Sequence, residues 1–154
     1  MTVHTLTRTT RLAHPLDRVF DFFSRAENLE HITPPWLGFR ILTPPPIEMR
    51  EGTAIEYAIK LRGLPMRWVS RIEQWDPPHQ FVDVQVRGPY RLWEHTHRFV
   101  AVEGGVEMTD TVRYSLPLGL LGVAINYLLV ARDLRSIFDY RASRIQRLIT
   151  AAVK

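Results

Sequence analysis

The chain has 154 residues, of which 45% are hydrophobic, and a formal net charge of +4. This length predicts one domain, residues 1–154, built around one core. The sequence contains no cysteine, which excludes disulfides and thiolate chemistry and is typical of a reducing compartment. The first fifteen residues lack the apolar centre of a signal peptide, so we expect a cytoplasmic protein.

The excess positive charge lies near the C-terminus, where residues 113–154 carry +5 and residues 1–112 carry −1. The arginines of this segment fall around a predicted helix rather than along one stripe, which favours a solvated helix over a membrane-docking surface. Arg141 lies between Phe138 and Ile145 and is the candidate for an inward-facing arginine. No nucleic-acid motif accompanies the charge, so we expect no nucleic-acid partner.

Membrane insertion is also not expected. The most apolar stretch, residues 116–131, contains Pro117, Gly119, Gly122 and Asn126. It is shorter than the ~20 apolar residues that a spanning helix needs.

The N-terminal third predicts one strand and two short helices. Residues 2–12 are rich in Thr, Val and Leu, as strands are, and Pro15 suits the first turn of a helix. A second short helix, about residues 26–32, ends at Pro34-Pro35 because proline cannot continue a helix. Two proline clusters then bracket residues 36–42, which could form a short strand or an extended loop.

From Thr53 onward the pattern changes to alternating apolar and polar residues, which is typical of half-buried strands. We expect strands over about residues 53–61, 66–73 and 81–86, followed by a hairpin over residues 90–114. A long amphipathic helix, from about Leu118 or Leu120 to Ala152, closes the chain. This order predicts an α+β fold in which one helix covers an antiparallel sheet.

The predicted hairpin places titratable groups among large apolar ones. Side chains alternate across a strand, and a tight turn at Gly104-Gly105 puts His97 opposite or diagonal to Asp110. Burying imidazoles and a carboxylate is costly unless they bond to one another, to water or to a ligand. The inner face of the hairpin therefore indicates a lined cavity, formed by Trp93, His95, His97 and Phe99 on one strand and Met108, Asp110, Val112 and Tyr114 on the other.

Several segments resemble the SRPBCC superfamily, also called START-like or birch-pollen-allergen-like, and in particular its bacterial ligand-binding or polyketide cyclase/dehydrase-like branch. They are NLEHITPPWLGF, WEHTHRF, GGVEMTDTVRY, YSLPLGLLG and IFDYR. The resemblance implies a helix-grip fold, in which a curved antiparallel sheet wraps a long C-terminal helix around a hydrophobic cavity. It implies no agreed catalytic residues, since members of the superfamily include carriers, receptors and cyclases.

The first functional hypothesis is that the cavity binds a hydrophobic or aromatic small molecule, lipid-like or polyketide-like. Such pockets are mostly apolar and contain a few placed polar groups. The candidate ligand-binding residues are Ile55, Tyr57, Ile59, Trp68, Ser70, Trp93, His95, His97, Phe99, Met108, Asp110, Tyr114, Leu121 and Leu128.

The second hypothesis is a cyclase or dehydratase. Here His97 would be the general base, oriented by Asp110, and His95 or Tyr114 would donate a proton to the substrate carbonyl. A hydrogen-bonded structural His–Asp pair is the alternative interpretation of the same residues.

A metal site is the third hypothesis, because His95, His97 and Asp110 could supply two imidazoles and a carboxylate. This spacing is common by chance, and the sequence offers no acidic residue besides Asp110 to orient either imidazole. We therefore expect neither a metal nor another cofactor.

Overall fold

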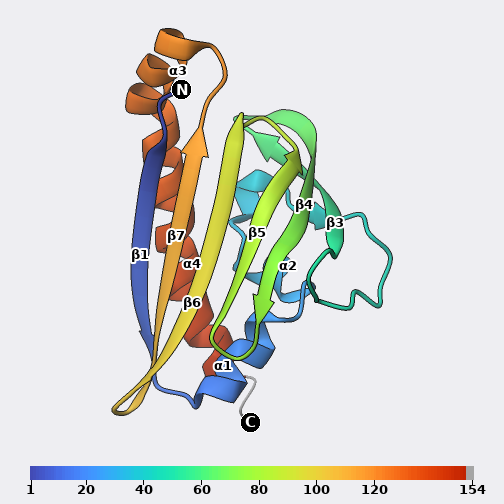
Figure 1. The fold of residues 1–154 in the computed structure, drawn as a ribbon, viewed down its shortest axis with the longest axis vertical. Helices are drawn as coiled ribbons and strands as arrows, with labels where there is room; N and C mark the ends of the chain where they lie inside the picture. The colour runs from blue at the N-terminus through green and yellow to red at the C-terminus, as the bar shows by residue number, and fades with distance from the viewer. Residues whose placement is uncertain (152–154) are drawn as a thin grey trace.

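The computed structural model describes residues 1–151 and contains a seven-stranded antiparallel sheet in the order β1-β7-β6-β5-β4-β3-β2 (Figure 1). All six expected strands, four single ones and the two of the hairpin, are present. The strands span His4–Leu12 (β1), Arg40–Ile41 (β2), Ala54–Leu61 (β3), Leu64–Asp76 (β4), Gln80–Arg87 (β5), Leu92–Val102 (β6) and Gly105–Ser115 (β7).

The helices lie in two groups, two short ones after β1 and a long series after β7. The first group comprises α1, Leu16–Phe23, and α2, Asn28–Ile32, followed in the sequence by a 3-10 turn, Pro35–Leu37. The C-terminal series comprises α3, Gly119–Ile125, a π-helical turn, Asn126–Val130, and α4, Ala131–Ala151. The predicted continuous helix is thus interrupted by a change of helix type, and its expected end at Ala152 lies outside the described residues.

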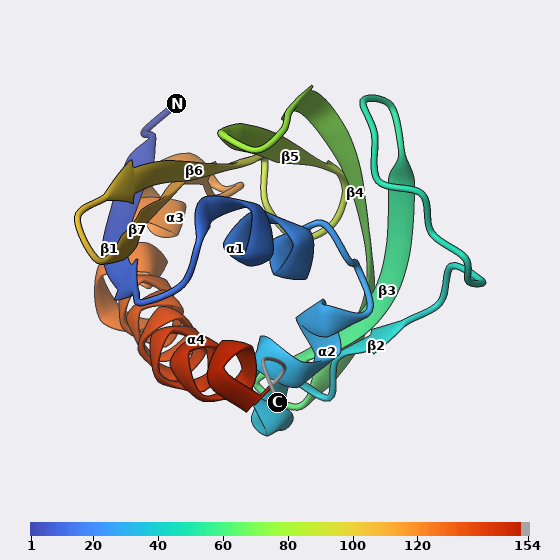
Figure 2. The ribbon, with the colours of Figure 1, turned by 90° about the horizontal axis from the view of Figure 1, so that it is seen from below.

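The sheet bends around α4. Two register irregularities of β4 against β5, at Val69/Ser70 and at Ile72/Gln74, add local twist and bend of the kind that curves a sheet. Viewed from below, the sheet forms an incomplete ring, and α4 covers the opening between its edges (Figure 2). This arrangement is an α+β helix-grip fold, as expected.

The pairing of β6 with β7 sets the inner face of the sheet. His97 lies directly opposite Asp110, and Val102 pairs with Gly105, so Glu103 and Gly104 form the turn rather than Gly104 and Gly105. Gly105 is needed for a different reason. A Cβ atom there would lie 2.1 Å from the carbonyl oxygen of Leu12, because β1 passes directly beside it.

The interior has two packed clusters of buried residues, one at each end. Phe99 and Met108 belong to the cluster under α1, where Phe99 contacts the rings of Phe20 and Phe23 at centroid distances of 5.4 and 5.3 Å. Tyr114 belongs to the other cluster, beside α4. These two clusters seal the ends of the space between sheet and helix.

The segment that joins β7 to α4 projects into solvent, contrary to the sequence prediction for two of its residues. Leu121 and Leu128 are 60% and 67% exposed, because α3 and the π-helical turn extend past the end of the sheet and nothing in the described chain covers this face (Figure 1). Within residues 1–151, none of the helices combines the length and apolar character needed to cross a membrane.

The alternation of β6 can be tested with a pair of neighbouring substitutions. Phe99→Ala removes a fully buried ring and should lower the free energy of unfolding by about 3–5 kcal/mol. Val100→Ala, on the solvent face, should change it by only about 0.5 kcal/mol. Urea unfolding measures both, and equal losses would contradict the assigned register.

Candidate functional site

A cavity of about 160 Å³ lies between the inner face of the sheet and α4. Its wall is mostly aromatic and aliphatic, with polar groups from the sheet and one arginine from the helix. The residues around it include Phe23, Phe39, Ile55, Tyr57, Ile59, Trp68, Ser70, Phe81, Asp83, Tyr90, Trp93, His95, His97, Leu134, Phe138 and Arg141.

Eight of the fourteen candidate ligand-binding residues line this cavity, because β3, β4 and β6 turn alternate side chains inward. They are Ile55, Tyr57, Ile59, Trp68, Ser70, Trp93, His95 and His97.

The other six candidates lie elsewhere, which corrects the predicted lining. Phe99 and Met108 pack in the buried cluster under α1. Leu121 and Leu128 face solvent. Asp110 lies behind the two histidines, and Tyr114 donates a hydrogen bond of 2.8 Å to Oδ1 of Asn126. The four side chains other than Leu121 and Leu128 lie on the inner face of the sheet as predicted, but neighbouring side chains separate them from the cavity.

One wall of the cavity is aromatic, and the hydroxyl group of Ser70 lies among its rings. The ring planes of Tyr57 and Trp68 are nearly parallel, and Trp93 meets Trp68 edge to face at 5.1 Å. Trp68 Nε1 donates to Ser70 Oγ at 3.1 Å, and the Tyr57 hydroxyl shares a 3.0 Å hydrogen bond with the same oxygen. Ser70 therefore orients two large side chains of the wall.

Two histidines and two carboxylates form a polar ring beside the cavity. His95 Nε2 lies 2.8 Å from Asp110 Oδ1, and His97 Nε2 lies 2.8 Å from Asp83 Oδ2. His97 Nδ1 is 3.1 Å from Asp110 Oδ1 without hydrogen-bond alignment, and His95 Nδ1 is 3.8 Å from Asp83 Oδ2. Each carboxylate thus faces both imidazoles.

This arrangement separates the pKa values of the two imidazoles. Burial lowers the pKa of His97, but hydrogen bonds and charges of Asp110 and Asp83 outweigh burial and raise it above its ordinary value. Burial and the charge of His97 lower the pKa of His95, which Asp110 offsets only in part. Burial raises the pKa of both carboxyls, but the two histidines outweigh it, so both values fall below normal. The two shifts run in opposite directions, so His97 is the more basic imidazole and His95 the less basic one.

Asp83 is the residue that the sequence prediction missed. It orients His97 from β5, although no acidic residue besides Asp110 was expected to do so. The signal was present, since Asp83 shares a strand face with Phe81, whose ring stacks on His97 at 4.1 Å. An acidic residue two positions from a core phenylalanine on a predicted strand indicates an inward carboxylate.

The potential metal ligands also differ from those considered in the sequence. Donor atoms of Asp83, His95 and His97 lie within 4.8 Å of one another, so Asp83 takes the place proposed for Asp110. Two features oppose a divalent cation there. The Asp83–His97 hydrogen bond already joins two of the ligands, and the positive charge of Arg141 acts on Asp83.

Arg141, on α4, also lines the cavity. Its burial confirms the prediction of an inward-facing arginine. It is 9% exposed and lies on the buried stripe of α4, four residues before Ile145. Its guanidinium carbon is 5.4 Å from the ring centroid of Phe138, a favourable cation–π distance.

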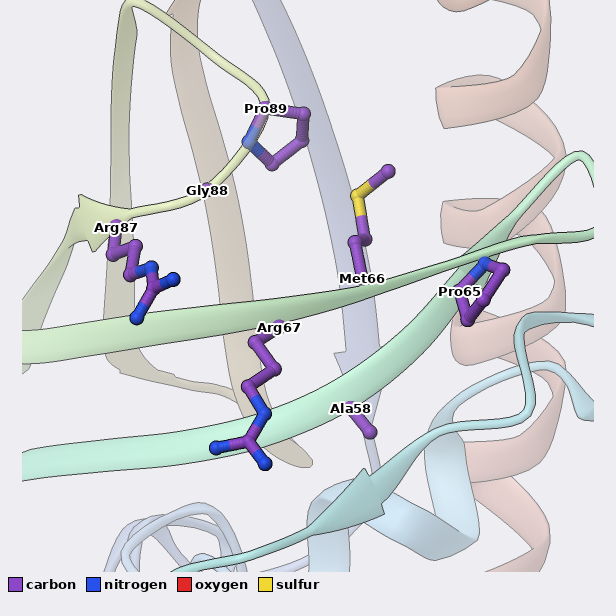
Figure 3. A pocket seen from close by; sticks show the side chains of 7 residues that line it. All are labelled: Ala58, Pro65, Met66, Arg67, Arg87, Gly88 and Pro89. Carbon is purple, nitrogen blue, oxygen red and sulfur yellow. The ribbon is translucent and has the colours of Figure 1, made fainter.

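A second hollow, open to solvent, lies at the other side of the sheet (Figure 3). It has no titratable group besides two arginines, and Arg67 is paired with Glu56 at 3.0 Å. The enclosed cavity, with its buried polar groups, is the better candidate for a functional site. The open hollow is formed by Ala58, Pro65, Met66, Arg67, Arg87, Gly88 and Pro89.

Three solved structures have a fold similar to that of this chain. The Zhui aromatase/cyclase from Streptomyces sp. R1128 has a TM-score of 0.77 and 15% identity, over 99% of this chain and 97% of that one. Protein Ms6760 from Mycobacterium smegmatis has a TM-score of 0.70 and 18% identity, over 99% and 98%. A nucleoside-diphosphate sugar epimerase from Corynebacterium glutamicum has a TM-score of 0.66 and 24% identity, over 92% of this chain and 28% of that one.

At these identities the three likenesses show a shared fold. A search of curated proteins gave no significant match. The model of the family described as polyketide cyclase/dehydrase and lipid transport matches residues 12–137. That match covers most of the sheet, the first part of α4 and nearly the whole cavity wall, and the chain therefore belongs to this family of the SRPBCC superfamily.

Proposed function

We propose that this protein binds a hydrophobic or aromatic small molecule in the cavity between the sheet and α4. The observation that carries the proposal is the cavity itself, about 160 Å³ of space inside an aromatic wall with a few polar groups. Small-molecule sites are typically enclosed and mostly apolar, with polar groups that fix the orientation of the ligand. The family description, which includes lipid transport, supports the same function.

An uncharged aromatic compound tests this proposal. Titrated 2-naphthamide should quench the tryptophan fluorescence of the native protein, because Trp68 and Trp93 line the cavity. Ile55→Trp fills the cavity from β3 and should weaken binding at least tenfold, about 1.4 kcal/mol. Calorimetric titration measures the affinity of the variant without relying on fluorescence.

The matched control is Ala54→Trp, which puts the same side chain on the exposed face of the same strand. It should bind 2-naphthamide with native affinity. If the native protein binds neither 2-naphthamide nor other apolar compounds of similar size, the binding function is wrong. If both variants bind equally well, the ligand lies outside this cavity.

A cyclase-type enzyme is the second candidate, and one specific observation favours it. His95 lines the cavity, its Nε2 is engaged by Asp110, and its Nδ1 has no hydrogen-bond partner among the described residues. A neutral imidazole held in one tautomer by a carboxylate is a suitable general base. His97, with a carboxylate near each nitrogen, is less suited to that role than was predicted.

The reaction would be an intramolecular aldol condensation of a chain carrying several ketones. His95 Nδ1 takes a proton from a carbon next to a carbonyl, and the enolate carbon attacks a second carbonyl carbon. The new carbon–carbon bond closes the ring, and the oxygen of the attacked carbonyl takes up a proton to give an alcohol. Loss of that hydroxyl group and a neighbouring proton as water then forms a double bond in the ring. The Tyr57 hydroxyl lines the cavity and is the candidate proton donor, whereas Tyr114 points to Asn126.

Proton abstraction can be measured without knowing the natural substrate. The native protein should accelerate exchange of the methyl protons of 2-acetonaphthone in D₂O, followed by NMR, and His95→Gln should reduce this acceleration roughly 10²–10⁴-fold. Because the pKa of His95 lies below 6.5, the base is already deprotonated at neutral pH. The rate should therefore fall only as the pH drops below 6.5, and be level above it.

His79→Gln is the control, since His79 is exposed on the β4–β5 turn. Binding of 2-naphthamide by His95→Gln separates loss of chemistry from loss of the cavity. Exchange no faster than in buffer, or exchange unaffected by His95→Gln, would contradict the enzymatic role and leave ligand binding as the function.

A further inference from the structure

The guanidinium of Arg141 carries two buried hydrogen-bond donors that the protein does not satisfy. Both Nε and Nη2 are buried and have no hydrogen-bond partner among residues 1–151. The other buried side-chain atoms in this situation belong to three residues and occur one per residue, namely Arg8 Nε, His97 Nδ1 and Ser115 Oγ. Two such donors on one cationic group are unfavourable, because a buried charge needs a partner.

These two atoms form one edge of the guanidinium, and the same edge of another arginine shows what it binds. Arg62 donates from Nε to Asp133 Oδ2 and from Nη2 to Asp133 Oδ1, both at 3.0 Å. This parallel pair of hydrogen bonds is the geometry in which arginine recognises a carboxylate. Arg141 presents the equivalent edge with no carboxylate on it.

The protein itself offers no acid for this edge. Asp83 is the one acidic residue among those that line the cavity, and it accepts a hydrogen bond from His97 Nε2 at 2.8 Å. Asp83 influences Arg141 through its charge, but the two residues form no ion pair within the described chain. Phe138 lies against the face of the guanidinium and offers its edge no hydrogen-bond acceptor.

We propose that Arg141 binds the carboxylate of the ligand, so that the cavity selects an aromatic or aliphatic carboxylic acid over a neutral compound of the same shape. This inference rests on the proposed binding function and specifies its ligand class. The apolar part of the acid lies against the wall formed by Tyr57, Trp68 and Trp93, and its carboxylate lies toward α4. A cavity of this size suits a ligand on the order of one or two rings.

The experiment compares 2-naphthoic acid with 2-naphthamide, which have nearly the same shape and differ in charge, by calorimetric titration at pH 7. The native protein should bind the acid about 30-fold or more tightly than the amide. Arg141→Met keeps much of the side-chain volume and removes the charge, so it should lose this preference while its affinity for the amide stays within about threefold of native. Arg141→Lys should keep part of the preference for the acid, because lysine retains the charge but cannot donate two parallel hydrogen bonds to one carboxylate.

Arg147→Met is the matched control, since Arg147 is an exposed arginine of the same helix. It should show the native preference. Melting temperature gives an independent readout, because 2-naphthoic acid should raise it more than 2-naphthamide does for the native protein and for Arg147→Met, but no more than the amide for Arg141→Met. Ligand-free Arg141→Met should melt no lower than the native protein, since the unpaired buried charge is gone.

The outcomes separate this inference from the function on which it rests. Equal affinity of the native protein for the acid and the amide would overturn the role of Arg141 and leave the binding cavity intact. Binding of neither compound would refute the binding function itself. If Arg141→Met fails to fold, as judged by circular dichroism, the ratio of the two affinities in the native protein and in Arg141→Lys still decides the question.

Discussion

The register between β6 and its neighbours β5 and β7 is the constraint on which the site depends. It sets His97 opposite Asp110 on one side, and pairs Asp83 with His95 on the other, so that four ionisable groups meet on the inner face. A shift of one residue in either pairing would turn half of these groups to solvent and leave the rest buried without partners. The cost of such a state makes the polar ring a determinant of register as well as a part of the cavity.

Curvature explains why a cavity exists beside this ring. A flat sheet packed on one helix would meet it along its whole width, but this sheet curves around α4, and the two irregularities of β4 against β5 add to the bend. The cluster under α1 fills one end of the interior, and the cluster that contains Tyr114, Leu134 and Phe138 fills the other. The cavity lies between the two clusters, inside a wall of large aromatic rings.

Ligand binding and acid–base chemistry make similar demands on these residues. A carrier needs groups that orient the polar atoms of its ligand, and an enzyme needs a base and a proton donor in the wall of the same cavity. His95 serves either purpose because Asp110 fixes its tautomer and leaves Nδ1 without a partner. Arg141 approaches from the helix on the opposite side, so the cavity has a polar group at the sheet and a separate cation at α4.

The sequence by itself determined the order of the elements, the α+β class and the inward faces of β3, β4 and β6, because hydrophobic periodicity records which side of a strand or helix is buried. The helix-grip arrangement was implied by the resemblance of its segments to the SRPBCC superfamily. It also indicated that His97 lies opposite or diagonal to Asp110, since a tight turn fixes the pairing of a hairpin. The direct pairing follows from the turn at Glu103 and Gly104, one position before the predicted one. Only the tertiary structure decided that Asp83 completes the ring, that α3 and the π-helical turn leave Leu121 and Leu128 in solvent, and that Phe99 and Met108 pack away from the cavity. These outcomes depend on contacts between residues far apart in the chain, and on the curvature of the sheet, which no local pattern encodes.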